Sequence, residues 1–139
     1  MSMENSGARQ GEGAATQTNK RRIVVAEDDP NILRQIAFNL EAHGYAVETA
    51  MTGADALKKL MVRRPDLLIT DVMMPEMDGF ELVASVRSDE DLADLPVIML
   101  TARSQDTDVA QGYNSGTDLY LTKPFNPSEL ISFVQRIVG

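Results

Sequence analysis

The stretch Leu-Leu-Ile-Thr-Asp-Val-Met-Met-Pro-Glu-Met-Asp-Gly, at residues 67–79, combines a strand pattern with the start of a helix. It opens with an apolar run that ends on Asp71, and Gly79 then begins a segment whose apolar residues recur at helical spacing. A short apolar run of this kind is typical of a strand buried on both faces of a parallel sheet. The stretch therefore predicts a central strand with an acid at its carboxyl end, followed by a loop and a helix.

The same alternation extends in both directions along the chain. Apolar runs at residues 23–26 and 96–101 also end at polar residues, and weaker strand patterns occupy 45–49 and 119–121. Segments with helical spacing begin near residues 30, 52, 79, 104 and 126, so one helix follows each strand. This order, with right-handed crossovers, predicts an α/β fold: a doubly wound, five-stranded parallel sheet with its functional crevice beyond the carboxyl ends of the strands.

Capping residues support these boundaries. Asp29 and Asn126 each precede a proline and are predicted N-caps, and His43-Gly44 predicts a helix end. Thr52 with Asp55 resembles a capping box. The buried face of the helix that follows is predicted to be formed by Ala56, Leu57, Leu60 and Met61.

At 139 residues the chain has the length of one domain. Residues 1–20 are mostly small and polar and lack apolar periodicity, so we expect a disordered tail followed by one folded domain at 21–139. The composition of the tail fits a natural extension and a cloning remnant equally well. A longer parent protein that continues past Gly139 also stays open.

Charge and composition argue against several classes of protein. The chain has 13 Lys and Arg against 21 Asp and Glu, and the four charged residues of the tail sum to zero, so the folded part carries the whole net charge of −8. This argues against direct binding to nucleic acid or to an anionic membrane surface. The chain has no cysteine, and no apolar run approaches the ~20 residues of a membrane span. With no signal-peptide pattern, we expect a cytoplasmic protein.

Polar residues gather where the predicted strands end. The first strand is followed by Glu27 and Asp28, the third ends on Asp71, the fourth ends on Thr101, and the fifth is followed by Lys123. If the first and third strands are neighbours, three carboxylates meet in one crevice. Like charges that close raise at least one pKa, and a divalent cation removes the conflict. A few oxygen ligands suit Mg²⁺ with retained waters.

These motifs occur in order and with a characteristic spacing. They are Glu27-Asp28, Asp71 with its loop to Gly79, Thr101-Ala102, and the run from Tyr120 through Lys123-Pro124 to Phe125. Together they resemble the receiver domain of bacterial two-component response regulators. The resemblance covers residues 21–139 and implies a flavodoxin-like (βα)5 fold with strand order 2-1-3-4-5.

The resemblance implies a role for each acid. Asp71 matches the aspartate that takes a phosphoryl group from a kinase phosphohistidine, and Asp28 matches the direct Mg²⁺ ligand. Glu27 matches a second acid, which usually acts through water, and the backbone carbonyl of Met73 would complete the protein ligands. These roles are chemically reasonable, because a carboxylate is a competent nucleophile and phosphoryl transfer depends mainly on positioning and charge neutralisation.

The resemblance also implies a switch and partners. Thr101 matches the hydroxyl that bonds one phosphoryl oxygen, Lys123 matches the lysine that pairs with another, and Tyr120 matches an aromatic that swings inward on activation. The Lys123–Pro124 bond is usually cis in this family. The implied protein is a signalling switch rather than a classical enzyme. Its implied partners are a sensor histidine kinase or phosphotransfer protein and an unidentified effector or output domain.

We expect residues 104–114 to change on phosphorylation, because Val109, Ala110 and Tyr113 alone anchor that predicted helix. The last helix has a broader apolar stripe, formed by Leu130, Ile131, Phe133, Val134, Ile137 and Val138. We therefore predict that residues 104–114, the fifth strand and the last helix form a partner or homodimer surface.

The main alternative is a Mg²⁺-dependent phosphatase with an aspartate nucleophile. Such an enzyme needs a second Asp two residues after the nucleophile as a general acid, and Met73 stands there. A nucleotide-binding domain is disfavoured because neither G-x-x-x-x-G-K-[ST] nor G-x-G-x-x-G follows the first strand. His43 is predicted to cap a helix rather than to donate a phosphoryl group.

Overall fold

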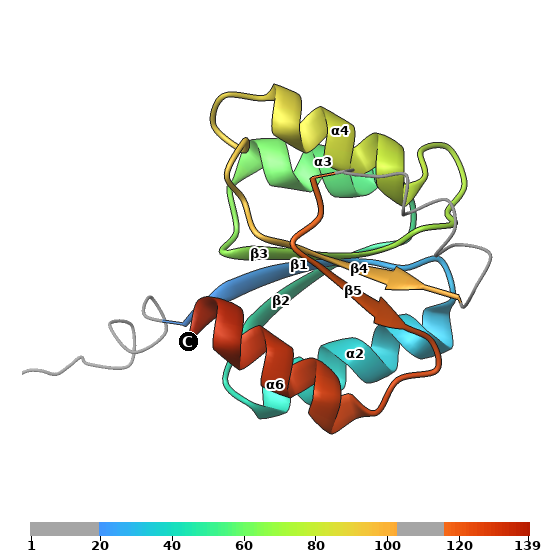
Figure 1. Ribbon diagram of the computed structural model, residues 1–139, viewed down its shortest axis with the longest axis vertical. Coiled ribbons are helices and arrows are strands. Elements are labelled where there is room, and N and C mark those ends of the chain that lie inside the picture. The colour runs from blue at the N-terminus through green and yellow to red at the C-terminus, as the bar shows by residue number, and fades with distance from the viewer. Residues whose placement is uncertain (1–19, 103–115) are drawn as a thin grey trace, which may run out of the picture.

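The computed structural model describes residues 20–102 and 116–139. The strands in this part of the chain are β1 (Arg22–Ala26), β2 (Ala46–Ala50), β3 (Leu67–Asp71), β4 (Val97–Thr101) and β5 (Leu119–Thr122) (Figure 1). The helices are α2 (Pro30–Ala42), α3 (Gly53–Val62), α4 (Gly79–Ser88) and α6 (Pro127–Val138). Residues 1–19 of the expected tail and the helix expected at 104–114 lie outside the described residues. No described helix is both long enough and apolar enough to cross a membrane.

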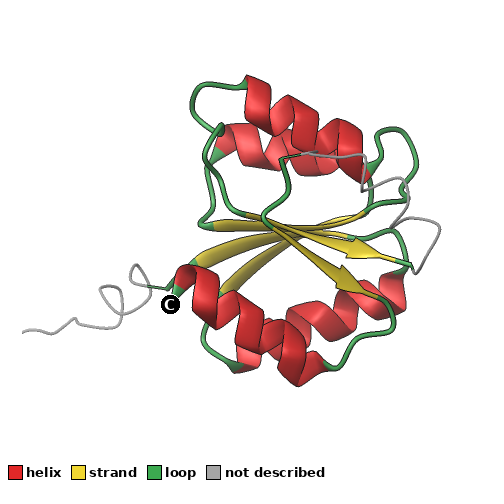
Figure 2. Ribbon diagram, in the orientation of Figure 1, coloured by secondary structure: helices red, strands yellow, loops and turns green. Residues whose placement is uncertain are grey.

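The sheet is parallel throughout, and its strands lie in the order β2-β1-β3-β4-β5. Helices α2 and α6 cover one face, and α3 and α4 cover the other, so the sheet lies between two helical layers (Figure 2). This arrangement confirms the predicted doubly wound, flavodoxin-like fold with strand order 2-1-3-4-5.

Each face of the sheet has its own core. Ile23 and Val25 of β1 pack on the α2 and α6 side, whereas Val24 and Ala26 pack on the α3 and α4 side. Successive side chains of a strand point to opposite faces, so a strand covered on both sides must be apolar along its whole length. Strands β3 and β4 are accordingly buried at every position.

The predicted caps form, with one difference. Asp29 and Asn126 cap α2 and α6, and His43 ends α2. Thr52 Oγ1 accepts the Asp55 N–H at 3.0 Å, but the Asp55 carboxylate pairs with Lys59 at 3.1 Å. The predicted capping box is therefore only half formed, because the short Asp55 side chain turns to the cation one helical turn away.

Two predicted details of the cores are wrong. Met61 was expected on the buried face of α3 but is 58% exposed. The buried stripe runs through Ala56 and Leu60, and Met61 lies about 100° around the helix from Leu60. Strand β2 also begins one residue later than predicted, at Ala46 instead of Tyr45. Tyr45 is buried, but its N–H donates to the Leu40 carbonyl of α2 at 3.2 Å, so it belongs to the turn that ends the helix.

The apolar stripe of α6 faces the core rather than solvent. Leu130, Ile131 and Val134 are buried, and Phe133, Ile137 and Val138 pack against the same cluster. The breadth of the stripe therefore reflects how α6 covers the sheet, and the argument that it suits a partner is wrong. A partner surface that includes α6 and β5 stays a prediction without that support.

Candidate functional site

The polar residues of the motifs meet at one edge of the sheet. Glu27 follows β1, Asp71 ends β3, Thr101 ends β4, and Lys123 follows β5. Strand β3 pairs with β1 on one side and with β4 on the other, and β5 pairs with β4. Parallel pairing therefore brings these four residues to the carboxyl edge of neighbouring strands, as the sequence predicted.

Three carboxylates form a compact cluster at this edge. One oxygen from each of Glu27, Asp28 and Asp71 lies within 4.8 Å of the others. Glu27 and Asp71 are buried, with exposed fractions of 1% and 6%, whereas Asp28 is open to solvent. The predicted meeting of three acids is thus present, and one of them lies where an incoming group can reach it.

Lys123 brings a positive charge to the two buried acids. Its Nζ lies 2.9 Å from Glu27 Oε1 and 3.2 Å from Asp71 Oδ1. Its backbone N–H donates to the Thr101 carbonyl at 2.6 Å, and the Lys123–Pro124 bond is cis, as the resemblance implied. The lysine is thus tied by its backbone to β4 and by its side chain to β1 and β3.

Burial dominates the titration of the site. It raises the pKa of Glu27 and of Asp71, and the nearby Lys123 ammonium only partly opposes this. The pKa of Lys123 is also raised, because the two carboxylates outweigh the burial that would lower it. Two carboxylates and one ammonium leave an excess of negative charge in a poorly solvated place, which a bound cation would relieve.

Backbone groups orient the acids. The Asp71 Oδ1 atom accepts the Val72 N–H at 2.9 Å, and Glu27 Oε2 accepts the Asp29 N–H at 3.1 Å. At the far end of the loop, the Gly79 N–H donates to the Val72 carbonyl at 2.7 Å. A Cβ on Gly79 would overlap the Asp71 carbonyl oxygen, so only glycine lets α4 begin this close to the acid.

The remaining predicted residues lie around this cluster. Thr101 is 1% exposed at the end of β4, next to Thr122 of β5. Tyr120 lies earlier on β5 and is 37% exposed, and the Met73 side chain, in the loop after Asp71, is 64% exposed. Glu27 Oε1 is a buried oxygen that contacts the Lys123 ammonium but accepts no well-aligned hydrogen bond from the part of the chain that the structure describes.

The donor set fits a hard divalent cation. Three carboxylates offer only oxygen atoms, and the partly exposed edge leaves room for retained waters. The sequence did not reveal that Glu27, rather than Asp28, is the buried acid paired with Lys123. That division depends on the Glu27 N–H, which still bonds to the Ala50 carbonyl of β2 at 3.0 Å and so extends the sheet past β1.

Comparison with known proteins places this geometry in one family. Residues 23–135 match the family described as response regulator receiver domain. The chain is 42% identical over 117 residues to the DNA-binding dual master transcriptional regulator RpaA of Synechocystis, covering 84% of this chain and 48% of RpaA. It is 39% identical over 118 residues to the alkaline phosphatase synthesis transcriptional regulatory protein PhoP of Bacillus subtilis, covering 85% and 48%. The chain thus spans about half the length of these relatives.

Solved structures of receiver domains and response regulators are similar to this chain. The signal receiver domain of a signal transduction histidine kinase from Syntrophus aciditrophicus is similar with a TM-score of 0.79 and 38% identity, covering 85% of this chain and 89% of that domain. The chemotaxis response regulator CheY4 of Vibrio cholerae has a TM-score of 0.80 and 35% identity, covering 86% and 99%. The similarity in fold and the similarity in sequence therefore both indicate the same family of receiver domains.

Proposed function

The chain belongs to the response regulator receiver domains of two-component phosphorelay signalling, and from that premise we propose that it takes up a phosphoryl group on Asp71. The observation that carries the proposal is the cluster of Glu27, Asp28 and Asp71 at the carboxyl edge, with the Lys123 ammonium between the two buried acids. This arrangement combines a nucleophile, ligands for a cation and a fixed positive charge in one place.

The proposed reaction transfers one phosphoryl group. An oxygen of the Asp71 carboxylate forms a bond to phosphorus while the bond from phosphorus to the donor imidazole nitrogen breaks. The electron pair of that bond stays on the nitrogen, and the histidine accepts a proton from solvent. The donor is a histidine kinase or a phosphotransfer protein, and a small acyl phosphate can replace it because the acceptor residues all belong to this chain.

The side chains of this protein would stabilise the charge that moves onto the transferred oxygens. Lys123 already lies 3.2 Å from Asp71 Oδ1, so its ammonium can follow a phosphoryl oxygen attached there. The Thr101 hydroxyl, at the end of the adjacent strand, would donate to a second oxygen. The Val72 N–H holds the acceptor carboxylate in place.

The acids would hold Mg²⁺. Asp28, Asp71 and the carbonyl of Met73 would bind the ion directly, and Glu27 would be the fourth group around it. The ion would neutralise negative charge on the acceptor and on the phosphoryl oxygens. Asp28 is the exposed member of the cluster and is therefore the ligand most accessible to an entering ion. The buried Glu27 would act through water, as its contact with Lys123 leaves it partly neutralised.

The signal would leave the site through Thr101 and Tyr120. A phosphoryl oxygen draws the Thr101 hydroxyl toward Asp71, and the space this vacates favours an inward position of Tyr120, which is 37% exposed here. Only a state that binds the phosphoryl group better is favoured, so phosphorylation shifts a population between two states. The effector that reads this change, or a second copy of the chain, would bind the surface that includes β5 and α6.

Mass spectrometry tests the acceptor. Incubation with acetyl phosphate and Mg²⁺ should add the mass of one phosphoryl group, and Asp71→Asn or an excess of EDTA should abolish the adduct. Asp94→Asn is the matched control, because Asp94 is an exposed acid bound to Arg64 outside the site. Undiminished labelling of the Asp71 variant would refute the assignment.

Calorimetry tests the cation. Wild type should bind one Mg²⁺ in the absence of any phosphoryl donor, and Asp28→Ala should lose most of that affinity. Asp55→Ala, which removes a carboxylate bound to Lys59 on α3, should leave it unchanged. Equal affinity in wild type and Asp28→Ala would contradict the ligand role.

A further inference from the structure

The loop between β3 and α4, residues 72–78, touches the first residue of α3. Gly53 is buried, and a Cβ at this position would overlap the Met77 carbonyl oxygen and lie 2.8 Å from both the carbonyl carbon and the Cβ of Met77. The nearest of these atoms are backbone, which cannot turn aside as the end of a long side chain can. A residue without a side chain is therefore what lets the helix and the loop approach this closely.

The loop is the softer of the two partners. Helix α3 is held by Ala56 and Leu60, which are 0% and 1% exposed, and by the cap at Thr52. The loop, in contrast, exposes Met73 and Pro75, and Glu76 has a φ of 69°, in the left-handed region that is unfavourable for a side chain. An added methyl group at position 53 would therefore displace the loop more than the helix.

The same loop is anchored at the proposed site by its first residue. Val72 donates to Asp71 Oδ1 at 2.9 Å and to the Leu100 carbonyl at 3.2 Å. With Val72 held by β4 and Met77 lying against Gly53, the residues between them have little freedom in where they place their backbone groups. Those residues include Met73, whose carbonyl is a proposed ligand of the cation.

We propose that Gly53 is a positioning residue for the phosphoacceptor loop: its missing side chain lets Met77 seat against α3 and so sets where the Met73 carbonyl lies relative to the acids. The inference rests on the proposed function for its consequence at the cation site, but the contact between α3 and the loop stands without it.

Two measurements on Gly53→Ala test the proposal. In the metal-free protein, amide chemical shifts should change mainly at residues 72–78 and little within 56–62 of α3. In a Mg²⁺ titration followed by NMR, the midpoint should rise roughly ten-fold, the lower end of the cost of disturbing groups that orient metal ligands. Acetyl phosphate labelling at saturating Mg²⁺ should recover most of the wild-type rate, because the acceptor and Lys123 are untouched.

Gly44→Ala is the matched control. It adds the same methyl group at a position with φ of 91° and nothing within 4 Å, so it costs backbone strain outside the site. It should lower the free energy of unfolding without moving the loop shifts or the Mg²⁺ midpoint. A Gly53→Ala variant that resembles Gly44→Ala in both readouts would overturn the proposal.

The proposal can also be tested if wild type binds no Mg²⁺ or if Gly53→Ala does not fold. If wild type binds no Mg²⁺, the proposed function fails, and the metal-free shifts alone judge Gly53: changes at 72–78 support the proposal, and changes confined to α3 refute it. If Gly53→Ala does not fold, Gly53→Ala/Glu76→Gly should, because glycine at position 76 accepts the positive φ and lets the loop yield. This double variant should keep the weak Mg²⁺ affinity, and a wild-type midpoint would refute the proposal.

Discussion

At the scale of single residues, Lys123 balances two acids that burial would otherwise leave uncompensated. Its ammonium contacts Glu27 and Asp71 at 2.9 and 3.2 Å, and both acids are almost fully buried. A buried ion pair is weak evidence for net stabilisation, but removal of one partner is costly because it strands the other. The site is therefore held together by a cation that its proposed chemistry also uses.

We predict that Lys123→Ala lowers the free energy of unfolding of the metal-free protein by about 3 kcal/mol near neutral pH, because two carboxylates lose their counter-charge. The loss should shrink in acid, where both carboxylates accept protons, and should be partly reversed by Mg²⁺. Urea unfolding in EDTA and in Mg²⁺ measures it. Asp55→Ala breaks a more exposed pair with Lys59 and should cost less than about 1 kcal/mol. Equal losses in the two variants would contradict the burial argument.

A second prediction concerns the charge of Asp71. Burial raises its pKa in the folded state above the ordinary value of 3.8, so ionisation is easier in the unfolded chain. The stability that the protonated group contributes is present below that ordinary value and is lost as pH rises through the folded pKa. In EDTA, Asp71→Asn should therefore be more stable than wild type near neutral pH, by roughly 1.4 kcal/mol per unit of pKa elevation.

The difference between Asp71→Asn and wild type should vanish at a pH below both pKa values and should shrink when Mg²⁺ binds wild type. Thermal unfolding of both proteins across the acid pH range measures how this difference depends on pH. A wild type that becomes more stable relative to the variant as pH rises in EDTA would show that Lys123 outweighs burial at this site.

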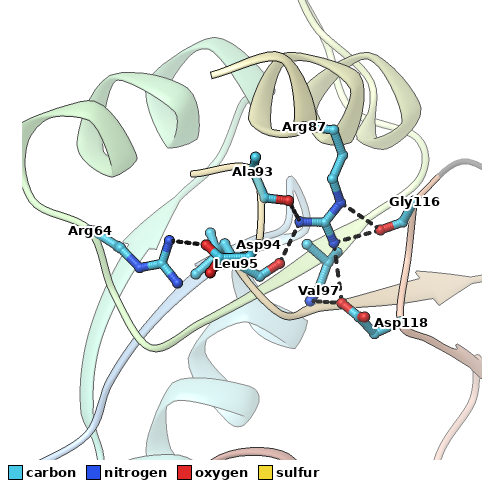
Figure 3. A network of polar contacts seen from close by, with 8 residues as sticks. All are labelled: Arg64, Arg87, Ala93, Asp94, Leu95, Val97, Gly116 and Asp118. Carbon is cyan, nitrogen blue, oxygen red and sulfur yellow. Dashed lines mark hydrogen bonds and ion pairs between the residues drawn. The ribbon is translucent and has the colours of Figure 1, made fainter. Parts of the chain in front are cut away.

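At the scale of elements, Arg87 joins three segments on the side of the sheet where β4 and β5 begin (Figure 3). From α4 its guanidinium donates to the carbonyls of Ala93, Leu95 and Gly116 and contacts the Asp118 carboxylate at 3.2 Å. Asp118 in turn accepts the Val97 N–H at 2.8 Å. One side chain thus ties the end of α4, the loop before β4 and the residues before β5 together.

We expect Arg87→Ala to lower the free energy of unfolding by about 3 kcal/mol, since several carbonyls lose a charged donor at once. The free energy of unfolding of Arg87→Lys should lie between those of wild type and Arg87→Ala, because an ammonium cannot reproduce the planar, forked set of N–H donors of the guanidinium. Arg64→Ala is the matched control: its pair with Asp94 is on the surface and should contribute less than about 1 kcal/mol. Hydrogen exchange at Val97 should speed up in the Arg87 variants and not in Arg64→Ala.

At the scale of the whole molecule, the curated relatives bind DNA or regulate transcription with chains about twice as long as this one. Residues 21–139 carry the whole net charge of −8, and none of the described helices contains more than two basic residues, too few for a helix that enters a DNA groove. We therefore predict that this chain alone does not retard random duplex DNA at low salt. A salt-sensitive shift with the isolated chain would contradict this, and RpaA serves as a positive control.

The proposed switch also makes a prediction for the whole molecule. Hydrogen exchange with and without beryllofluoride, a phosphoryl mimic, should differ within residues 101–122 and stay nearly constant in α3. Strand β5 lies between Lys123 and the segment held by Arg87, whereas α3 packs against β1, β2 and α4. Change that is equal in both regions, or greater in α3, would count against a switch through Thr101 and Tyr120.

The order of the described elements, the parallel sheet and the edge where Glu27, Asp28, Asp71, Thr101 and Lys123 meet could all be predicted from the sequence. These features follow from local patterns: apolar runs, capping residues and the position of each acid at a strand end. The resemblance to receiver domains supplied the strand order and the cis bond at Lys123, and both are present.

Which acid is buried, how α6 covers the sheet, and which groups Arg87 and Gly53 contact follow from the tertiary structure and could not be predicted from the sequence. Arg87 contacts Gly116 across 29 residues of sequence, and Gly53 meets Met77 of another loop. Contacts of this kind depend on sheet register and on the fit between helices, which no window of neighbouring residues encodes. The Glu27–Lys123 pair is the clearest case, because its residues follow β1 and β5, which are not adjacent in the sheet, and meet only once the sheet has formed.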